Sequence, residues 1–353
     1  MKGRLCMAFQ KNQWISKILS EESVRAMPII SFPAVSLLGV TVKDFIRDPK
    51  IQAQAILAVH DRCPEAAASL CPMDLSVEAE CFGTPVRFSE GEVPTCSAPL
   101  LDPDLDEDEH LEAAEALSIP EIGSGRTDVY LEAVRIASQE IHDRPLFAGC
   151  IGPFSLAGRL VDVTSSLMFC LTEPEYMETV LEKTTEFIIR YIRAFKEAGA
   201  DGIIMAEPLA GLLSPGIAAE FSGNYCRRVS EAVKDEHFAF LYHNCGNTAN
   251  ITTESILLSD ADLYNFGNVV DMEDMLQKMP EDVIVTGNVD PVRTLRFGTP
   301  ESVRDEVAGI LSRCGKYKNF MLSTGCDVPP ATGWENIDAL YGAVKEFNEA
   351  YTS

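Results

Sequence analysis

The stretch DGIIMAEPLAGLLSPGIAAEFSGNYCRRVSEAVKDEHFAFLYHN, residues 201–244, contains two short apolar runs separated by a helical segment. The runs at 201–207 and 238–244 are continuously apolar in their centres, which is typical of strands in a parallel sheet covered on both faces. Between them, Ser214 forms a helix N-cap and Pro215 occupies the first helical position. The stretch therefore predicts a strand–helix–strand unit with parallel strands.

The same alternation extends along the whole chain. Six further apolar runs are MPIISF (27–32), ASLCPM (68–73), PLFAGCI (145–151), ADLYNF (261–266), DVIVTGN (282–288) and NFMLST (319–324). The long segment 174–200 has apolar residues at three- and four-residue spacing and a stop signal at Gly199, and Thr299–Pro300 repeats the helix start. Eight strands alternating with helices predict an α/β fold, specifically a closed (β/α)8 TIM barrel.

No break in composition divides the chain, so we expect one domain over residues 1–353. It would have an N-terminal extension at about 1–26 and an insertion after strand two, at about 76–125. Within the insertion, FGTPVRF (82–88) predicts a β-hairpin with its turn at Gly83–Pro85. The acidic run LDPDLDEDEHLEAAE (101–115) is typical of an exposed linker or helix start, rather than of a docking surface for a basic partner.

The formal net charge of −25 disfavours nucleic acid and anionic membrane surfaces as partners, because like charges repel. No window approaches 18 consecutive apolar residues, and the N-terminus lacks the apolar core of a secretory signal. We therefore expect a cytoplasmic protein. The 11 cysteines are scattered, so most should be reduced core residues.

Polar residues gather where the expected strands end. Because barrel enzymes place their active sites at the C-terminal ends of the strands, these residues should share one rim. The set is Asp74, Glu207, His243, Asn244, Cys245, Asn265, Asn288, Asp290, Cys326 and Asp327.

A zinc site can be read from this set. His243 and Cys245 lie two positions apart on an extended segment, so their side chains point the same way, and Cys326 follows the last strand. One histidine and two cysteines with an open fourth position are typical of catalytic zinc, and Glu207 could fill or guard that position. The alternative is a buried histidine with two inert cysteines. The shared strand-end location and the glycines beside both cysteines, Gly246 and Gly325, favour the metal site.

Five motifs carry a family resemblance: GPFSLAGRL (152–160), AEPLAGLLSP (206–215), HNCGNT (243–248), TGNVDP (286–291) and LSTGCDVPPATGWENIDAL (322–340). In this order they resemble the uroporphyrinogen decarboxylase superfamily over nearly the whole chain. The His-x-Cys pair with a distant Gly-Cys resembles its zinc-dependent corrinoid methyltransferase branch, of the methylcobalamin:coenzyme M type.

That resemblance implies Zn²⁺ bound by His243, Cys245 and Cys326. It also implies methyl transfer between methylcobalamin, carried by a corrinoid protein, and a thiol such as coenzyme M or a pterin such as tetrahydrofolate. We assign substrate binding to Asn265, Asn288 and Arg159. An anionic acceptor needs a cation at the rim, for which the candidates are Arg159, Arg293 and Arg296.

Two alternatives stay open. Asp74 matches the catalytic aspartate of the haem-pathway decarboxylases, which would make the protein a metal-free decarboxylase that uses Asp74. The candidate catalytic residues of the chain are Asp74 and Glu207. Those enzymes, however, begin with an arginine-rich segment where this chain has MPIISFPAVSLLG (27–39). The second alternative is an inert corrinoid- or tetrapyrrole-binding protein. The sequence leaves the methyl acceptor and the oligomeric state open, a homodimer included.

Overall fold

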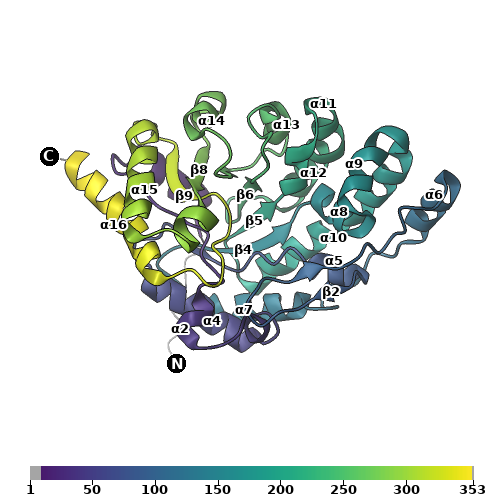
Figure 1. Cartoon of the computed structure of the whole chain (residues 1–353), viewed down its shortest axis with the longest axis horizontal. Helices are drawn as coiled ribbons and strands as arrows, with labels where there is room; N and C mark the ends of the chain where they lie inside the picture. The colour runs from purple at the N-terminus through teal and green to yellow at the C-terminus, as the bar shows by residue number, and fades with distance from the viewer. Residues whose placement is uncertain (1–8, 352–353) are drawn as a thin grey trace.

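A parallel β-sheet forms the centre of the molecule in the computed structural model, which describes residues 9–351 (Figure 1). Seven strands lie in the order β1-β4-β5-β6-β7-β8-β9, and all neighbouring pairs are parallel. Their bounds are β1 Ser69–Leu70, β4 Leu146–Ile151, β5 Gly202–Ala206, β6 Ala239–Asn244, β7 Leu263–Phe266, β8 Ile284–Val289 and β9 Phe320–Thr324. Seven of the eight predicted strands are therefore confirmed.

The first predicted strand, at 27–32, is not a regular strand. Instead, Ala26 forms parallel bridges to Ala66, just before β1, and to Leu322 in β9. These contacts join the two edges of the curled sheet. Pro28 has no N–H to continue the hydrogen-bond ladder, which is one reason why the prediction of a regular strand was wrong here.

The sheet has two faces of different character. In register across four strands, Ile204, Leu241, Leu263 and Ile284 form an apolar layer inside the curled sheet. Two residues later along the same strands, the next layer contains three polar side chains. It consists of Ala206, His243, Asn265 and Thr286. Side chains alternate along a strand, so the residues between these layers face the surrounding helices. The C-terminal end of the sheet is thus where polar groups enter its interior.

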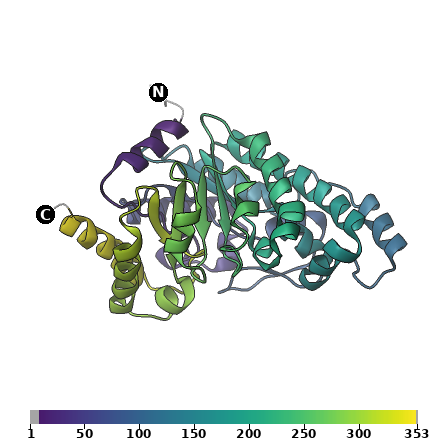
Figure 2. The same cartoon turned by 90° about the horizontal axis from the view of Figure 1, so that it is seen from above.

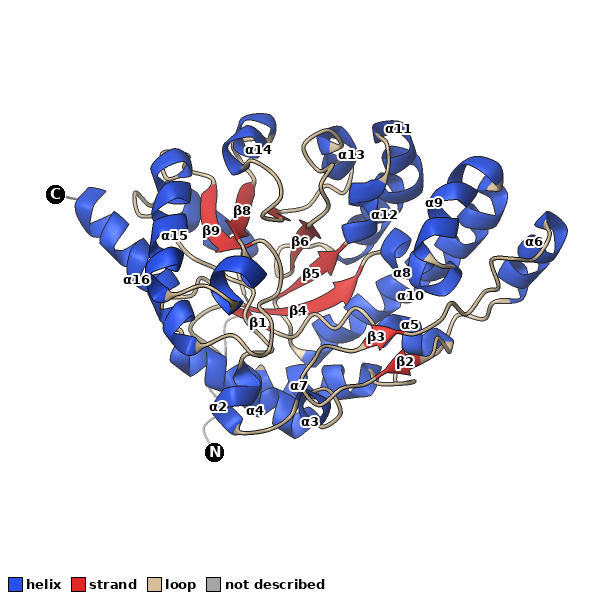
Figure 3. Ribbon diagram, viewed as in Figure 1, coloured by secondary structure: helices blue, strands red, loops and turns tan. Residues whose placement is uncertain are grey.

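Helices cover the outside of the sheet (Figure 3). The α-helices are α1 Lys11–Ser20, α2 Ala34–Leu38, α3 Val42–Phe45, α4 Pro49–Arg62, α5 Val77–Phe82, α6 Glu107–Ala116, α7 Thr127–Ala137, α8 Pro153–Val161, α9 Val163–Thr172, α10 Pro174–Ala198, α11 Pro215–Ala218, α12 Asn224–Val233, α13 Thr253–Leu257, α14 Met272–Lys278, α15 Pro300–Cys314 and α16 Trp334–Tyr351. Three short turns of other helix types are η1 Pro208–Leu212, η2 Ala219–Gly223 and η3 Pro291–Arg296.

The predicted helix signals act as expected. Gly199 ends α10 with a φ of 103°, a conformation that glycine adopts without strain, and Thr299 forms a capping box at the start of α15. Ser214 is the N-cap of α11, although its side chain makes no capping hydrogen bond.

Between residues 9 and 351 no single helix is both long and apolar enough to cross a membrane; only α8 and α9 together reach that measure, across a 106° bend.

The segment after β1 differs from the prediction. Residues 77–82 form helix α5, and Gly83 ends it with a φ of 111° instead of forming a hairpin turn. A hairpin does exist, but it pairs β2 (Val86–Arg87) with β3 (Thr95–Cys96). The acidic run begins α6 with a capping box at Asp106, so its prediction as a helix start is confirmed. Helices α6 and α16 lie at opposite ends of the molecule (Figure 2).

Candidate metal centre

The three predicted soft ligands come together at the C-terminal end of the sheet. One ligand atom each from His243, Cys245 and Cys326 lies within 4.8 Å of the other two. His243 is on β6, Cys245 is one residue beyond that strand, and Cys326 lies two residues beyond β9. Residues 243 and 245 share a direction because they are two apart on extended backbone.

Asn265 fixes the orientation of His243. Its Oδ1 lies 2.6 Å from His243 Nδ1, and its Nδ2 donates to Thr286 Oγ1 at 2.7 Å and to the Thr324 carbonyl at 3.3 Å. Because Nδ2 is engaged with two acceptors, Oδ1 must face the ring, and His243 Nδ1 donates to it. The opposite nitrogen, Nε2, is then left with its lone pair. It is buried and makes no hydrogen bond of normal geometry to any residue between 9 and 351.

The two thiols are coupled to each other. A hydrogen bond from Cys326 lowers the pKa of Cys245, against the opposing effect of burial. The same bond, together with burial, raises the pKa of Cys326 well above its ordinary value. Burial opposes protonation of His243, but the nearby Cys326 sulfur and the hydrogen bond that Nδ1 donates to Asn265 outweigh it and raise the pKa of His243. The coupling therefore shifts the pKa values of the two thiols in opposite directions, with that of Cys245 lowered and that of Cys326 raised.

Glycines let the loops around the cluster approach closely. A Cβ atom on Gly246 would lie 2.4 Å from the Cα of Gly211, and one on Gly325 would lie 2.4 Å from the backbone nitrogen of Asn268. Both distances are too short for any side chain. The two glycines next to the cysteines are thus required by backbone-to-backbone packing, which fixes where the thiols lie.

Glu207 lies on the other face of the sheet. Ala206 is in register with His243 inside the sheet, so the next residue, Glu207, points outward to α8. Its Oε1 accepts hydrogen bonds from Ser155 N at 2.6 Å and Ser155 Oγ at 3.0 Å. Burial raises the pKa of Glu207 to about 8, although the bonds from Ser155 oppose this. Glu207 is not within 4.8 Å of all three soft ligands, and the sequence interpretation overlooked the two-residue alternation here.

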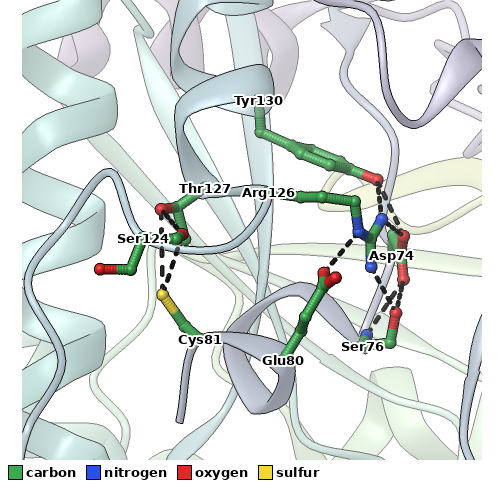
Figure 4. A network of polar contacts seen from close by, with 8 residues as sticks. All are labelled: Asp74, Ser76, Glu80, Cys81, Ser124, Arg126, Thr127 and Tyr130. Atoms are coloured by element: carbon green, nitrogen blue, oxygen red, sulfur yellow. Dashed lines mark hydrogen bonds and ion pairs between the residues drawn. The ribbon is translucent and has the colours of Figure 1, made fainter. Parts of the chain in front are cut away.

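Asp74, predicted as a catalytic residue, lies in a buried network (Figure 4). Its carboxylate forms an ion pair with Arg126 and accepts hydrogen bonds from Ser76 Oγ at 2.6 Å and Tyr130 OH at 2.9 Å. Arg126 is also paired with Glu80 at 2.5 Å. Sequence reasoning missed Arg126 and Tyr130, because nothing in the pattern at the start of α7 distinguishes a buried arginine from a surface one.

The two asparagines predicted to bind substrate have structural partners. All hydrogen-bonding groups of the Asn265 side chain are engaged within the sheet. Asn288 donates to the carbonyls of Gly267 at 3.0 Å and Val270 at 2.9 Å, so it supports the loop after β7. Neither amide has an N–H to spare for a substrate.

The metal cluster and the Asp74 network share one end of the sheet. Asp327, next to Cys326, accepts a hydrogen bond from Ser31 Oγ at 2.6 Å. Burial raises the pKa of Asp327 to about 7, and the bond from Ser31 opposes this. Asp74 follows the end of β1 and Asp327 follows the end of β9, so both belong to the C-terminal end of the parallel sheet.

Comparisons with known proteins agree with this architecture. The family model described as uroporphyrinogen decarboxylase (URO-D) matches residues 11–347. A methylcobamide:CoM methyltransferase, MtbA, of Methanosarcina acetivorans is 27% identical over 284 residues, 78% of each chain. A uroporphyrinogen decarboxylase of Hydrogenovibrio crunogenus is 25% identical over 320 residues, 87% of this chain and 86% of its own.

A solved structure supports the fold independently. A methyltransferase from Methanosarcina mazei superimposes with a TM-score of 0.83 at 24% identity, covering 96% of this chain and 99% of that one. At this identity the likeness establishes the fold alone. The sequence relatives include both methyltransferases and decarboxylases at similar identity, so the chemistry must be argued from the site.

Proposed function

The chain belongs to the uroporphyrinogen decarboxylase family, and we propose that within it the protein is a zinc-dependent methyltransferase. In this proposal it moves a methyl group between a methylcobamide, carried by a corrinoid protein, and a thiol or pterin acceptor. The observation that carries the proposal is the His243, Cys245 and Cys326 cluster, with its three donor atoms within 4.8 Å of one another.

The donor set fits zinc. Two thiols and an imidazole are the ligands that zinc prefers, and three protein ligands leave a position open for substrate. The buried lone pair of His243 Nε2 has no hydrogen-bond donor within the described chain, as expected of a ligand atom. When bound there, zinc would favour deprotonation of a thiol substrate and so make it nucleophilic at neutral pH.

The chain's own residues prepare this set. The hydrogen bond to Asn265 Oδ1 places a proton on His243 Nδ1, so a metal would bind this ring through Nε2. The coupling between Cys245 and Cys326 lowers the pKa of Cys245, so this thiol loses its proton to a metal more readily than an isolated buried thiol would. Gly246 and Gly325 let the loops pack closely, so the two sulfur atoms need little rearrangement to act together.

A porphyrinogen decarboxylase is the second candidate, because Asp74 is buried at the same end of the sheet and decarboxylases are comparably similar relatives. The charges around Asp74 argue against it. The arginine that pairs with Asp74, Arg126, is shared between two carboxylates, Asp74 and Glu80. No positive charge is left in this network for a substrate with several carboxylates.

Metal analysis tests the proposal. We expect about one zinc per chain in the purified protein, as in other three-ligand zinc enzymes. Cys326→Ala should lose the zinc and the ability of the protein to consume methylcobalamin when a thiol or tetrahydrofolate is added. Cys81→Ala is the matched control, because Cys81 is also half-buried but lies outside the cluster, where it bonds to the Ser124 carbonyl.

Two outcomes would contradict the proposal. Metal-free protein that decarboxylates a porphyrinogen would establish the second candidate. Zinc-loaded protein that binds a corrinoid but consumes no methylcobalamin with any thiol or with tetrahydrofolate would identify an inert binding protein.

A further inference from the structure

Arg159 on α8 is half-buried and lacks an acidic partner. It makes no hydrogen bond, ion pair or ring contact with another residue that the structure describes, and its Nε atom is buried without a hydrogen-bond acceptor. The chain has 54 acidic and 29 basic residues, so acidic side chains are plentiful. A buried N–H without an acceptor is destabilising, while the rest of this half-buried guanidinium stays accessible, which indicates that an acceptor comes from outside the chain.

The position of Arg159 relates it to the candidate metal centre. Burial raises the pKa of Cys96 on β3, and the nearby Arg159 guanidinium is the largest opposing influence. Asp74 and Arg126 act on the same thiol, so Arg159 lies near the network at the end of β1. Asp74 follows β1 and Cys326 follows β9 in the same parallel sheet, so the network and the loop of Cys326 both lie at the C-terminal end of that sheet. Arg159 and the metal cluster therefore belong to the same end of the sheet.

The other cations considered at this rim are already paired or exposed. The side chain of Arg293 is 81% exposed and lies within 4.0 Å of carboxylates of Asp290 and Glu306. Arg296 is paired with Glu92 at 3.3 Å. Exposed cations with nearby carboxylates bind a further anion weakly, because water and the existing partner compete for it.

We propose that Arg159 binds an acidic group of the methyl acceptor and that this acceptor is a small molecule with one or two acidic groups at its recognition end. The inference rests on the proposed function. Guanidinium binds sulfonate or carboxylate oxygens through two parallel hydrogen bonds, which suits both a sulfonated thiol and the glutamyl carboxylate of a reduced folate. A single unpaired cation does not suit a porphyrinogen, whose several carboxylates would stay uncompensated.

Paired probes test this on the zinc-loaded protein by calorimetric titration. The thiol pair is 2-mercaptoethanesulfonate and the neutral 2-mercaptoethanol; the pterin pair is tetrahydrofolate and 6-methyltetrahydropterin, which lacks the aminobenzoylglutamate and carries no carboxylate. We expect the wild type to prefer the acidic member of one pair, which identifies the acceptor class. Arg159→Gln should weaken binding of that member roughly tenfold to a hundredfold, as for loss of a charged hydrogen bond, and leave the neutral member unchanged.

The controls separate a specific effect from a damaged fold. Arg159→Lys keeps the charge and should retain part of the preference. Arg293→Gln removes an exposed cation from the same rim and should bind all four probes as the wild type does. Zinc content and the unfolding midpoint should be the same in all of these variants.

The inference is overturned if Arg159→Gln keeps the wild-type preference, or if the wild type binds acidic and neutral probes equally. The second result, obtained with protein that contains zinc and transfers a methyl group to 2-mercaptoethanol, removes the Arg159 site and leaves the proposed function intact. Protein that contains no zinc and transfers no methyl group would contradict the proposed function. It would also contradict the proposal that the acidic molecule bound by Arg159 is a methyl acceptor.

Discussion

Asn265 is the residue on which the geometry of His243 depends most. Its Oδ1 accepts from Nδ1, and its Nδ2 donates to Thr286 and to the Thr324 carbonyl. Asn265→Ala would free the imidazole to rotate or change tautomer. Partners of metal-bound histidines typically contribute about 10–100-fold to metal affinity, so we expect a loss of that size, measured by competition with a chromophoric zinc chelator.

Asn319 supplies the control for Asn265. It is also buried, and its Nδ2 donates to the Pro280 carbonyl. Asn319 directly precedes β9, so it lies at the opposite end of that strand from Cys326. Asn319→Ala should keep the zinc affinity of the wild type. Equal losses in the two variants would mean that Asn265 contributes general stability and not the orientation of His243.

At this scale the sequence predicted part of the site. Two-residue alternation was enough to pair His243 with Cys245, and strand order brought Cys326 to the same end. The same alternation turns Glu207 away, but this follows only when the register with β6 is known. The Arg126–Asp74 pair joins residues 52 positions apart, and one sequence carries no signal for such a contact.

At the scale of elements, Glu207 joins the end of β5 to the start of α8. Its Oε2 is buried without a partner and lies 1.6 Å from where a Cβ on Gly152 would be. Burial raises its pKa from 4.5 to about 8. Between these values the folded chain keeps a proton that the unfolded chain releases, so the free energy of unfolding falls as the pH rises from about 4.5 to 8.

Glu207→Gln removes this titration while keeping a hydrogen-bonding side chain of similar shape. We expect the variant to lose less stability than the wild type between pH 5 and pH 8.5, measured by urea unfolding at both values. Glu78 has a pKa of about 8 for the same reason, burial, so some pH dependence should persist until Glu78→Gln is added. An unchanged difference between the two pH values in Glu207→Gln would show that this carboxyl group does not titrate as described.

The elements themselves were largely predictable from local pattern. Continuous apolar runs located the seven strands, and Thr299 and Gly199 marked helix ends through local hydrogen bonding and backbone freedom. The predicted hairpin was misplaced because a glycine such as Gly83 is compatible with either a hairpin turn or the C-terminal end of a helix. The choice depends on whether residues 77–82 pack as a helix, which is a tertiary effect.

At the scale of the whole molecule, the sheet is closed by a segment that is not a regular strand. Ala26 bridges both edges, and two side chains of β9 extend the contact. Ser323 Oγ donates to the Met27 carbonyl at 2.7 Å, and the N–H of Ile29 donates to Thr324 Oγ1 at 2.9 Å. Side chains thus replace part of the backbone ladder, and the structure has a curled seven-stranded sheet with bridged edges in place of the predicted closed barrel of eight strands.

This closure can be tested at Thr324, which is fully buried. Thr324→Val keeps the shape of the side chain but leaves the buried N–H of Ile29 without an acceptor. Such a loss typically costs about 1–3 kcal/mol, which should appear as a lower free energy of unfolding in a denaturant titration. Thr172→Val removes a similar side-chain bond, to the Met168 carbonyl on the exposed surface of α9, and should change stability by less than about 0.5 kcal/mol. If both variants unfold at the same denaturant concentration as the wild type, the side-chain bond at Thr324 does not stabilise the closed sheet, and closure depends on the backbone contacts of Ala26 and Met27 alone.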